Sequence, residues 1–495
     1  MQRCIVILVC LVGLLTIGCS KEQEPASLAP ARQEAVAFDA DVQAFASTVM
    51  EQAGWPLEAT AEEMTDAGAA LGKKGPAPVF GFERTHIAGN IALYTLRLRV
   101  GPGQYDVIGL NRIVKEKRPF QPIKTAKSLF FQHGSSKTFV GMMLPGVTSP
   151  TTPDNFGMGY FLARNDVDVW GIDQAWAIVP ATETNTDFMI DWGLARQMND
   201  LRTAVGVARL TRIMTGCGNA KMILAGYSNG VPTTISLVNE ETQLPTYLRN
   251  IGGYIPIDNA IKVDAGAMKD ALVKYATDYS EFVAAGNGGE MVYFAMMADA
   301  VRNNPDGHDF DATLTNVEYV LNVVAGPTLF PGHPFHYWAA TWTDGKPTGL
   351  RFTDWELWLD FLASGTAWEP YIWTAEWCGY VAGTFDTPYD DHLGEIRVPI
   401  LNLTPAGGYA DATFYGLSLL GSRDKETIMP SMGGPVEQEF HTSTSSPLRK
   451  PSCWSGGRCC AGSGRIRPDS DGRAGALLLT AEPVLSVPLP QPGAI

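Results

Sequence analysis

The segment "KMILAGYSNGVPTTISLV", residues 221–238, places a serine between two glycines where one sequence pattern gives way to another. The short apolar run before the serine is typical of a buried strand, and the run after it is typical of a helix. Gly226 and Gly230 permit a turn tight enough to hold Ser228 in a strained conformation at the end of the strand. The flanking strand and helix make this G-x-S-x-G match specific, and Ser228 is a candidate nucleophile.

A second motif lies upstream, where the apolar run "SLFFQ" (residues 128–132) is followed by His133, Gly134 and Ser135. Together with the strand–G-x-S-x-G–helix unit, this pattern resembles the α/β-hydrolase family, particularly its lipases and esterases, over about residues 82–440. The resemblance implies a mostly parallel sheet and a triad in the chain order serine, acid, histidine. It also implies an oxyanion hole built from the backbone N–H groups of Ser135 and Asn229, with His133 and Gly134 shaping the loop.

Two aspartates are candidates for the acid of that triad. Asp411 lies in the loop after the apolar run "RVPILNLT" (residues 397–404), which is where the family usually places its acid. Asp258, at the end of the preceding strand, is the alternative that some relatives use. Asp411 also precedes a helical stretch, so capping of that helix is a third interpretation.

The histidine of the triad is selected by chain order. Of the seven histidines, His441 alone follows both the acid and the last predicted strand, "ETIMPSM" (residues 426–432). His133 belongs to the loop beneath the oxyanion and is interpreted as structural. The family order therefore predicts His441 as the general base.

The sequence after His441 departs from the family pattern. Relatives continue into an apolar loop and a closing amphipathic helix, whereas residues 441–472 are polar, aperiodic and rich in Gly, Ser and Arg. This acidic protein also becomes basic over residues 441–495, with six Lys/Arg against three Asp/Glu. A shifted reading frame starting near His441 can encode a family-like ending. We therefore hypothesise a frameshift, with a genuine disordered tail as the alternative.

Strand and helix patterns alternate along the body of the chain. Residues 91–100 and 105–114 flank "GPGQ" and predict a hairpin, while residues 166–173 and 251–258 predict further strands. Apolar residues recur with helical spacing from Leu194 onward, and Gly216 suits the end of that helix. Alternating strands and helices predict an α/β fold with a mostly parallel sheet.

Residues 259–394 interrupt this alternation and are predicted to be an insertion. They contain seven tryptophans: Trp338, Trp342, Trp355, Trp358, Trp368, Trp373 and Trp377. One interpretation is a helical lid that lines an apolar pocket over the edge of the sheet. The other is a helical subdomain whose aromatic residues fill its own core.

The N-terminus has the features of an export signal. Residues 1–18 combine Arg3 with an apolar run too short to span a bilayer, and they end in "LTIGC", which resembles a bacterial lipobox. The resemblance implies cleavage before Cys19 and lipidation of its thiol. The polar, Pro/Ala-rich composition that follows predicts a linker (residues 19–35), and a helical segment is predicted after it (residues 36–81). An ordinary signal peptide cut elsewhere is the alternative. Both predict export, and the lipobox predicts anchoring in the bacterial cell envelope.

Composition excludes several classes of protein. A net charge of −15 disfavours nucleic-acid partners, because phosphate binding needs basic surfaces. Only Cys217 and Cys378 lie in the body of the chain, so it is no disulfide scaffold, although one bridge between them is possible. No His/Cys/Asp/Glu cluster has ligand spacing, and neither a metal nor a cofactor is expected.

The sequence thus predicts an exported, lipid-anchored serine hydrolase that cleaves carboxylic esters. The alternative is a non-catalytic binding lipoprotein whose hydrolase fold is inactivated by its altered C-terminus.

Overall fold

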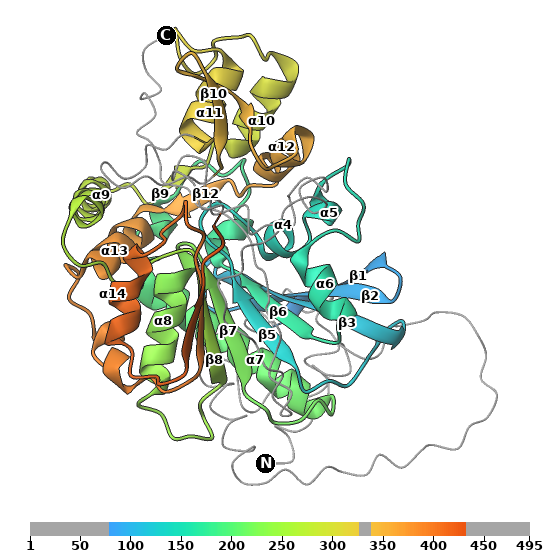
Figure 1. Ribbon diagram of the computed structural model, residues 1–495. Coiled ribbons are helices and arrows are strands. Elements are labelled where there is room, and N and C mark those ends of the chain that lie inside the picture. Colours follow the sequence, from blue (N-terminus) through green and yellow to red (C-terminus); the bar gives the residue numbers. More distant parts are fainter. Residues whose placement is uncertain (1–78, 326–337, 432–495) are drawn as a thin grey trace.

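A ten-stranded mixed sheet forms the centre of the molecule (Figure 1). The computed structural model describes residues 79–325 and 338–431. The strand order is β1-β2-β3-β6-β5-β7-β8-β13-β14, with β4 paired to β3. These strands are β1 (Val79–Ala88), β2 (Ile91–Arg99), β3 (Val107–Arg118), β4 (Gln121–Pro122), β5 (Ser128–Gln132), β6 (Asp168–Asp173), β7 (Met222–Tyr227), β8 (Ile251–Ile257), β13 (Ile400–Leu403) and β14 (Lys425–Ile428).

The sheet changes from antiparallel to parallel at β6. Strands β1, β2 and β3 pair antiparallel, and β3 pairs antiparallel with β6. From β6 through β5, β7, β8 and β13 to β14, every pairing is parallel. The predicted fold class, α/β with a mostly parallel sheet, is confirmed.

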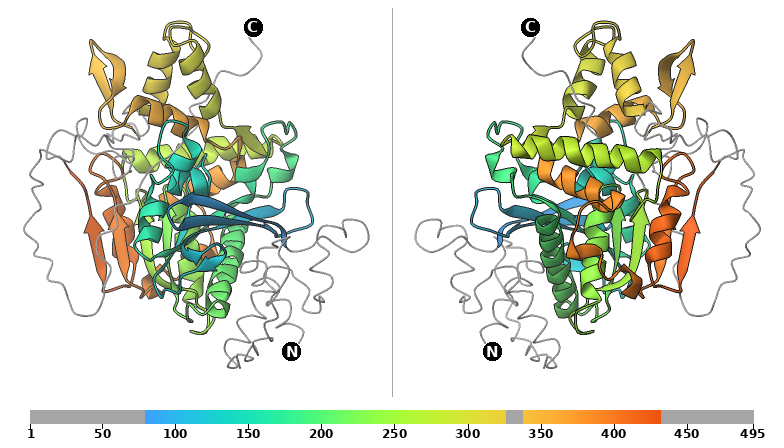
Figure 2. Two further views of the ribbon diagram at one scale, coloured as in Figure 1. Left: turned by 90° about the vertical axis from the view of Figure 1, so that its right-hand side faces the viewer. Right: turned by 90° about the vertical axis from the view of Figure 1, so that its left-hand side faces the viewer.

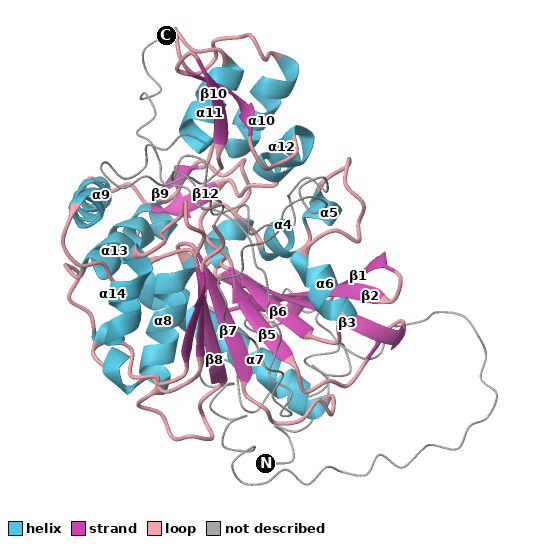
Figure 3. Ribbon diagram, viewed as in Figure 1, coloured by secondary structure: helices cyan, strands magenta, loops and turns pink. Residues whose placement is uncertain are grey.

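Helices connect the strands and pack beside the sheet (Figure 3). Those of the sheet domain are α4 (Phe139–Met143), α5 (Pro145–Thr148), α6 (Met158–Arg164), α7 (Leu194–Met214), α8 (Gly230–Glu241) and α14 (Ala412–Leu419). Short 3₁₀ turns are η1 (Ala175–Ile178), η2 (Asp187–Met189), η3 (Pro388–Asp390) and η4 (Leu393–Glu395).

Alternate residues of β6 contact helices on the two faces of the sheet. A Cβ on Gly171 would lie 2.1 Å from the Phe139 ring of α4, so α4 occupies one face. Asp168, which points to the other face because side chains alternate along a strand, pairs with Arg212 of α7. Both faces of the parallel sheet are therefore covered, which explains why its central strands β5 and β7 are mostly apolar.

Most elements predicted from sequence lie close to their predicted positions. The hairpin is β2–β3, the run "SLFFQ" is the wholly buried β5, and the helix predicted from Leu194 is α7. Gly216 follows α7 with φ of +77°, a conformation that favours glycine after a helix. Strand β13 is shorter than predicted because Pro399, which lacks an N–H group, precedes it.

A buried ionic cluster ties strands β3 and β6 to α7. Arg112 Nε of β3 lies 2.8 Å from Asp168 Oδ1 of β6, and the Arg212 guanidinium of α7 contacts Asp168 Oδ2. Burial alone would raise the pKa of Asp168, but Arg112 and Arg212 outweigh it and hold this pKa below its ordinary value. The two body cysteines, Cys217 and Cys378, are both buried and free, so they form no bridge.

The insertion between β8 and β13 has two parts. In the first part, α9 (Ala267–Ala284) and α13 (Tyr371–Ala382) pack together beside the sheet (Figure 2). The second part lies above the sheet and consists of α10 (Phe294–Asn303), α11 (Asn316–Ala325), α12 (Trp355–Ala363) and the hairpin of β10 (Ala340–Thr343) and β11 (Lys346–Leu350). Strands β9 (Gly289–Met291) and β12 (Trp368–Pro370) pair antiparallel between these parts.

Most tryptophans of the insertion fill cores. Trp338, Trp358, Trp368, Trp373 and Trp377 are buried, whereas Trp342 is 42% exposed. Trp358 contacts both Trp338 and Trp355, and Trp373 packs on Trp176 of the sheet domain. For these rings the structure agrees with the core-filling interpretation.

Several sequence predictions fall outside the described residues. These are the signal peptide, Cys19, the linker, nearly all of the helical segment at 36–81, His441 and the tail. Within the described ranges, no helix combines the length and apolar character needed to cross a membrane.

Candidate active site

Ser228 lies at the tight turn between β7 and α8, as predicted. Its φ is +49°, in the left-handed region that non-glycine residues seldom occupy. A Cβ on Gly226 would lie 2.0 Å from Thr234 Oγ1, and one on Gly230 would lie 2.6 Å from the His133 carbonyl oxygen. Both glycines are thus sterically required, because helix α8 and the His133 loop pack directly against the turn.

The strained conformation of Ser228 is held by its backbone. Its N–H donates to the Ile257 carbonyl of β8 at 2.9 Å, and its carbonyl accepts from the Val231 N–H at 2.8 Å. The side chain is 1% exposed, and its Oγ has no hydrogen-bond partner among the described residues. Strain at a buried hydroxyl without a structural partner is typical of a functional position.

The upstream His-Gly loop lies against this turn. A Cβ on Gly134 would lie 2.9 Å from Ser228 Cβ and 3.0 Å from the Tyr227 carbonyl oxygen. The Asn229 side-chain amide donates to the Ser135 hydroxyl, which joins the two predicted oxyanion residues directly. Over the described part of the chain, neither the Ser135 nor the Asn229 backbone N–H has an acceptor. Two N–H groups in this arrangement can bind a developing oxyanion.

His133 is placed as a structural residue. Its Nδ1 lies 2.7 Å from the Gly134 carbonyl and therefore donates, while its Nε2 accepts from the Gln174 N–H at 3.2 Å. Burial lowers the pKa of His133, so the ring is neutral at pH 7. Both ring nitrogens are occupied, and His133 therefore holds the shape of the loop.

The two candidate acids differ sharply in environment. Asp258 follows β8 directly, is 1% exposed, and accepts from the Tyr409 N–H at 3.0 Å. Asp411 is exposed at the start of α14, and its side chain makes no capping bond there. The loop between β13 and α14 thus brings Tyr409 against one candidate, Asp258, and presents the other, Asp411, to solvent.

The predicted base, His441, lies beyond the described residues. Three described histidines make local contacts: His86 Nε2 with the Gly89 carbonyl, His308 Nδ1 with the Leu314 carbonyl, and His392 Nδ1 with Glu395. The structure therefore brings the predicted nucleophile and the predicted oxyanion residues together, and the acid–base pair stays a prediction.

Sequence reasoning missed a pair of residues that reach this site from the insertion. The Ser136 N–H donates to Glu369 Oε2 at 3.2 Å, and the Ser136 carbonyl accepts from the Thr366 N–H at 2.8 Å. These residues are more than 200 positions away from Ser136, and no local motif marks them. Only the pairing of the insertion with the loop brings them together.

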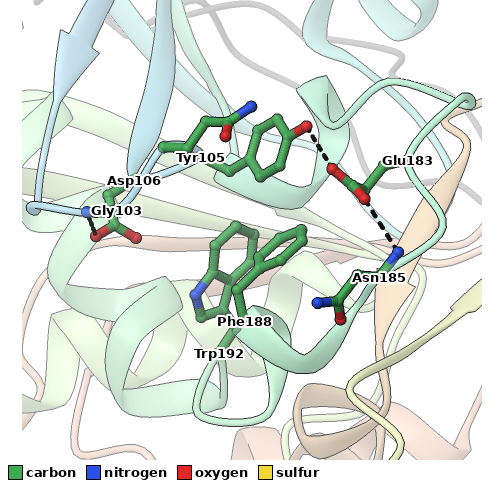
Figure 4. A pocket seen from close by; sticks show the side chains of 8 residues that line it. Gly103, Tyr105, Asp106, Glu183, Asn185, Phe188 and Trp192 are labelled. Carbon is green, nitrogen blue, oxygen red and sulfur yellow. Dashed lines mark hydrogen bonds between the residues drawn. The ribbon is translucent and has the colours of Figure 1, made fainter.

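No group of three or more His, Cys, Asp or Glu side chains is placed to hold a metal ion within the described ranges. A cavity of about 220 Å³ lies elsewhere, between the β2–β3 loop and the segment around η2 (Figure 4). Its carboxylates are already engaged, since Glu183 accepts from the Tyr105 hydroxyl at 2.6 Å and Asp106 pairs with Arg196 at 2.8 Å. Of the described candidates, neither Ser228 nor Asp258 nor Asp411 lines this cavity.

Comparison with known proteins yields fold-level likenesses only. No family model matches the chain. No curated protein matches it either. Among solved structures, it resembles a protein from Sulfolobus solfataricus provisionally assigned as a lipase, with 15% identity and a TM-score of 0.47 over 72% of this chain and 93% of that one.

Two further solved structures show weaker likeness. A soluble variant of monoglyceride lipase from Saccharomyces cerevisiae has 11% identity and a TM-score of 0.34 over 73% of this chain and 89% of that one. The rice cell wall degrading esterase LipA from Xanthomonas oryzae has 12% identity and a TM-score of 0.34 over 70% and 84%. At these TM-scores, any functional interpretation of this chain rests on its own geometry. That geometry is a mostly parallel sheet that carries a serine on a strand–turn–helix unit.

Proposed function

We propose that this chain is a serine hydrolase of the α/β-hydrolase type that cleaves carboxylic esters. The observation that carries the proposal is the position of Ser228: its backbone is left-handed, it is buried, its Oγ has no hydrogen-bond partner among the described residues, and it contacts the His133–Gly134 loop. A serine held this way at the end of a central parallel strand is the arrangement used for nucleophilic attack on acyl groups.

In the proposed reaction, Ser228 Oγ attacks the carbonyl carbon of the ester while His441 takes the hydroxyl proton. The Ser135 and Asn229 N–H groups bind the resulting oxyanion. Collapse of the tetrahedral intermediate breaks the ester bond, and His441 returns the proton to the departing alcohol. Water then hydrolyses the acyl-enzyme by the same steps. Asp411 orients the imidazole in this proposal, and Asp258 is the alternative acid.

The direct test is hydrolysis of p-nitrophenyl esters of increasing chain length by the wild type and by Ser228→Ala. Loss of a triad nucleophile typically lowers kcat by several orders of magnitude, and we expect that loss with an unchanged melting temperature. Ser280→Ala, on the exposed face of α9, is the matched control and should keep full activity. Near-normal hydrolysis by Ser228→Ala would show that another residue is the nucleophile.

The insertion is proposed to act as a lid over the site. Figures 1 and 2 show α10–α12 and the β10–β11 hairpin above the end of the sheet where β5 and β7 finish. Because the Ser228 side chain is 1% exposed, an ester can reach it only if its covering moves. The aromatic composition of the insertion favours an apolar acyl group in this proposal.

Export and membrane anchoring belong to the same proposal. The sequence "LTIGC" and the polar linker after it support acylation of Cys19 in the bacterial envelope. Each buried methylene of an acyl chain contributes about 0.8 kcal/mol, so several chains on one residue would anchor the protein stably. We expect Cys19→Ala to move the protein from membrane to soluble fractions, and a mature N-terminus at any other residue would contradict the lipobox interpretation.

A second candidate function is supported by the composition of the tail. If residues 441–495 are the genuine C-terminus, the base is poorly supported and the chain could serve as a non-catalytic binding lipoprotein. In that case Ser228→Ala would leave ligand binding unchanged, and the wild type would not hydrolyse esters above background.

A further inference from the structure

The loop that carries one proposed oxyanion donor contains a strained residue next to it. Ser136 has φ of +60°, a left-handed conformation that costs a non-glycine residue on the order of 1–3 kcal/mol unless its surroundings stabilise it. Ser136 follows Ser135 directly, so its conformation determines where the loop, including the Ser135 N–H, lies relative to Ser228.

The insertion holds both backbone polar groups of Ser136. Glu369 Oε2 of β12 accepts its N–H at 3.2 Å, and the Thr366 N–H donates to its carbonyl at 2.8 Å. The neighbouring Lys137 ammonium donates to the Phe361 carbonyl. The segment from Phe361 to Glu369 therefore clamps the loop at Ser136 and Lys137, while Asn229 holds the Ser135 hydroxyl.

The carboxyl group of Glu369 lies in an unusual environment for a hydrogen-bond acceptor. It is 4% exposed, has no basic partner among its described contacts, and stands opposite Glu290 in the β9–β12 pairing. Burial, followed by the neighbouring Glu290, raises the pKa of Glu369 to about 8, so the carboxyl is largely neutral at pH 7. A neutral carboxyl still accepts a hydrogen bond through its carbonyl oxygen, as a glutamine amide does.

We propose that Glu369 is a positioning residue of the active site, through which the insertion holds Ser136 in its strained conformation and so aims the Ser135 N–H at the oxyanion. This inference rests on the proposed hydrolase function. It makes the insertion a structural part of the catalytic site as well as its cover. Glu369 itself touches neither the nucleophile nor the substrate in this role.

The test compares two replacements that differ only in hydrogen bonding. Glu369→Gln retains an acceptor for the Ser136 N–H, whereas Glu369→Met keeps a similar volume without one. We expect Gln to stay within about threefold of wild-type kcat, while Met should lose roughly 10- to 100-fold in kcat, approaching the effect of removing one oxyanion donor. KM should change little, because the clamp acts on the transition state.

Two controls keep the result interpretable. Thr387→Ala removes a side chain that is only 6% exposed, at the start of η3 and outside the contact with Ser136, so kcat should stay near the wild-type value. If Glu369→Met does not fold, Glu369→Asp withdraws the acceptor by one methylene, and the same loss in kcat is expected. Melting temperature and far-UV circular dichroism establish that each variant is folded.

Full kcat in folded Glu369→Met, or an equal loss in Glu369→Gln, would overturn this inference. Ser228→Ala, assayed in parallel, separates it from the proposed function. If Ser228→Ala is inactive while Glu369→Met is fully active, only the role of Glu369 is wrong. If Ser228→Ala is active, the hydrolase mechanism itself is wrong.

Discussion

The nucleophile side and the acid–base side of the proposed site are built very differently. Ser228, Gly134 and Ser135 sit on short turns between buried elements, and contacts under 3 Å would form if a Cβ were added at Gly134, Gly226 or Gly230. Asp411 ends the loop between β13 and α14, Asp258 is held by the Tyr409 N–H of that loop, and His441 lies beyond the described residues. A strand–turn–helix unit fixes its serine locally, whereas an acid and a base carried by loops depend on whatever packs around those loops.

The choice of acid gives the largest expected effect. Asp411→Asn and Asp258→Asn should be compared in the more active of the given chain and a frame-restored chain. Loss of the triad carboxylate leaves the imidazole misoriented and costs roughly 10⁴-fold in kcat. We expect that loss in Asp411→Asn and a smaller one in Asp258→Asn, measured as kcat on a p-nitrophenyl ester. A larger loss of kcat in Asp258→Asn than in Asp411→Asn would identify Asp258 as the acid of the triad.

The rigidity of the nucleophile side depends on the stability of the sheet beneath it. Substitution of Asp168 tests this dependence. Asp168→Asn leaves Arg112 and Arg212 buried without a carboxylate, and breaking a buried ionic pair costs about 3–5 kcal/mol of unfolding free energy. Denaturant unfolding measures this loss. Asp166→Asn, at an exposed ion pair with Lys115, is the matched control and should cost about 1 kcal/mol or less.

The same cluster predicts a pH dependence. Because the folded-state pKa of Asp168 is lowered, its contribution is fully present above the unfolded-state pKa of about 3.9 and is lost as pH falls through the lower folded value. Wild-type stability should therefore decline below about pH 4 more steeply than that of Asp168→Asn. Parallel acid unfolding curves would contradict the ionised state of Asp168.

Restoring the reading frame just before His441 tests the weaker side of the site directly. A base displaced by about 1 Å can lose about 100-fold in rate, and the present tail offers little apolar surface to hold it. We expect the restored chain to gain about 100-fold in kcat/KM and to melt at a higher temperature. Equal activity and stability in the two chains would favour a genuine, functional tail.

The smallest effect is expected from adding a methyl group beside Ser228. A methyl group on Gly134 would meet Ser228 Cβ at 2.9 Å, and such overpacking typically costs about 1–3 kcal/mol. Gly134→Ala should therefore melt earlier and lose kcat by roughly tenfold as the oxyanion loop shifts. Gly394→Ala, whose added Cβ would have no neighbour nearer than 4.0 Å, should change neither quantity.

The sequence predicted best where structure follows from local pattern. The strand–turn–helix around Ser228, the buried β5 and the hairpin β2–β3 each depend on neighbouring residues, and all three formed as expected. Strand β13 was predicted too long at its N-terminal end, because Pro399 lies just before its first residue.

Features that depend on distant contacts could not be predicted. The Glu369–Ser136 bond joins residues 233 positions apart, and Glu376 of α13 accepts the Leu194 N–H at the start of α7 across 182 positions. Neither carboxylate lies in a recognisable motif. The packing of most insertion tryptophans in cores was likewise open from sequence, because buried and pocket-lining aromatics follow the same pattern.

Covalent labelling of Ser228 tests the central claim most directly. The given and frame-restored chains, each with its Ser228→Ala counterpart, would be treated with a fluorophosphonate and examined by peptide mass spectrometry. A fluorophosphonate reacts with a serine that is activated by its base and oxyanion hole. The account predicts a single adduct on Ser228, formed faster in the restored chain and absent from both alanine variants. An unmodified Ser228 in both chains, or an adduct on another serine, would contradict it.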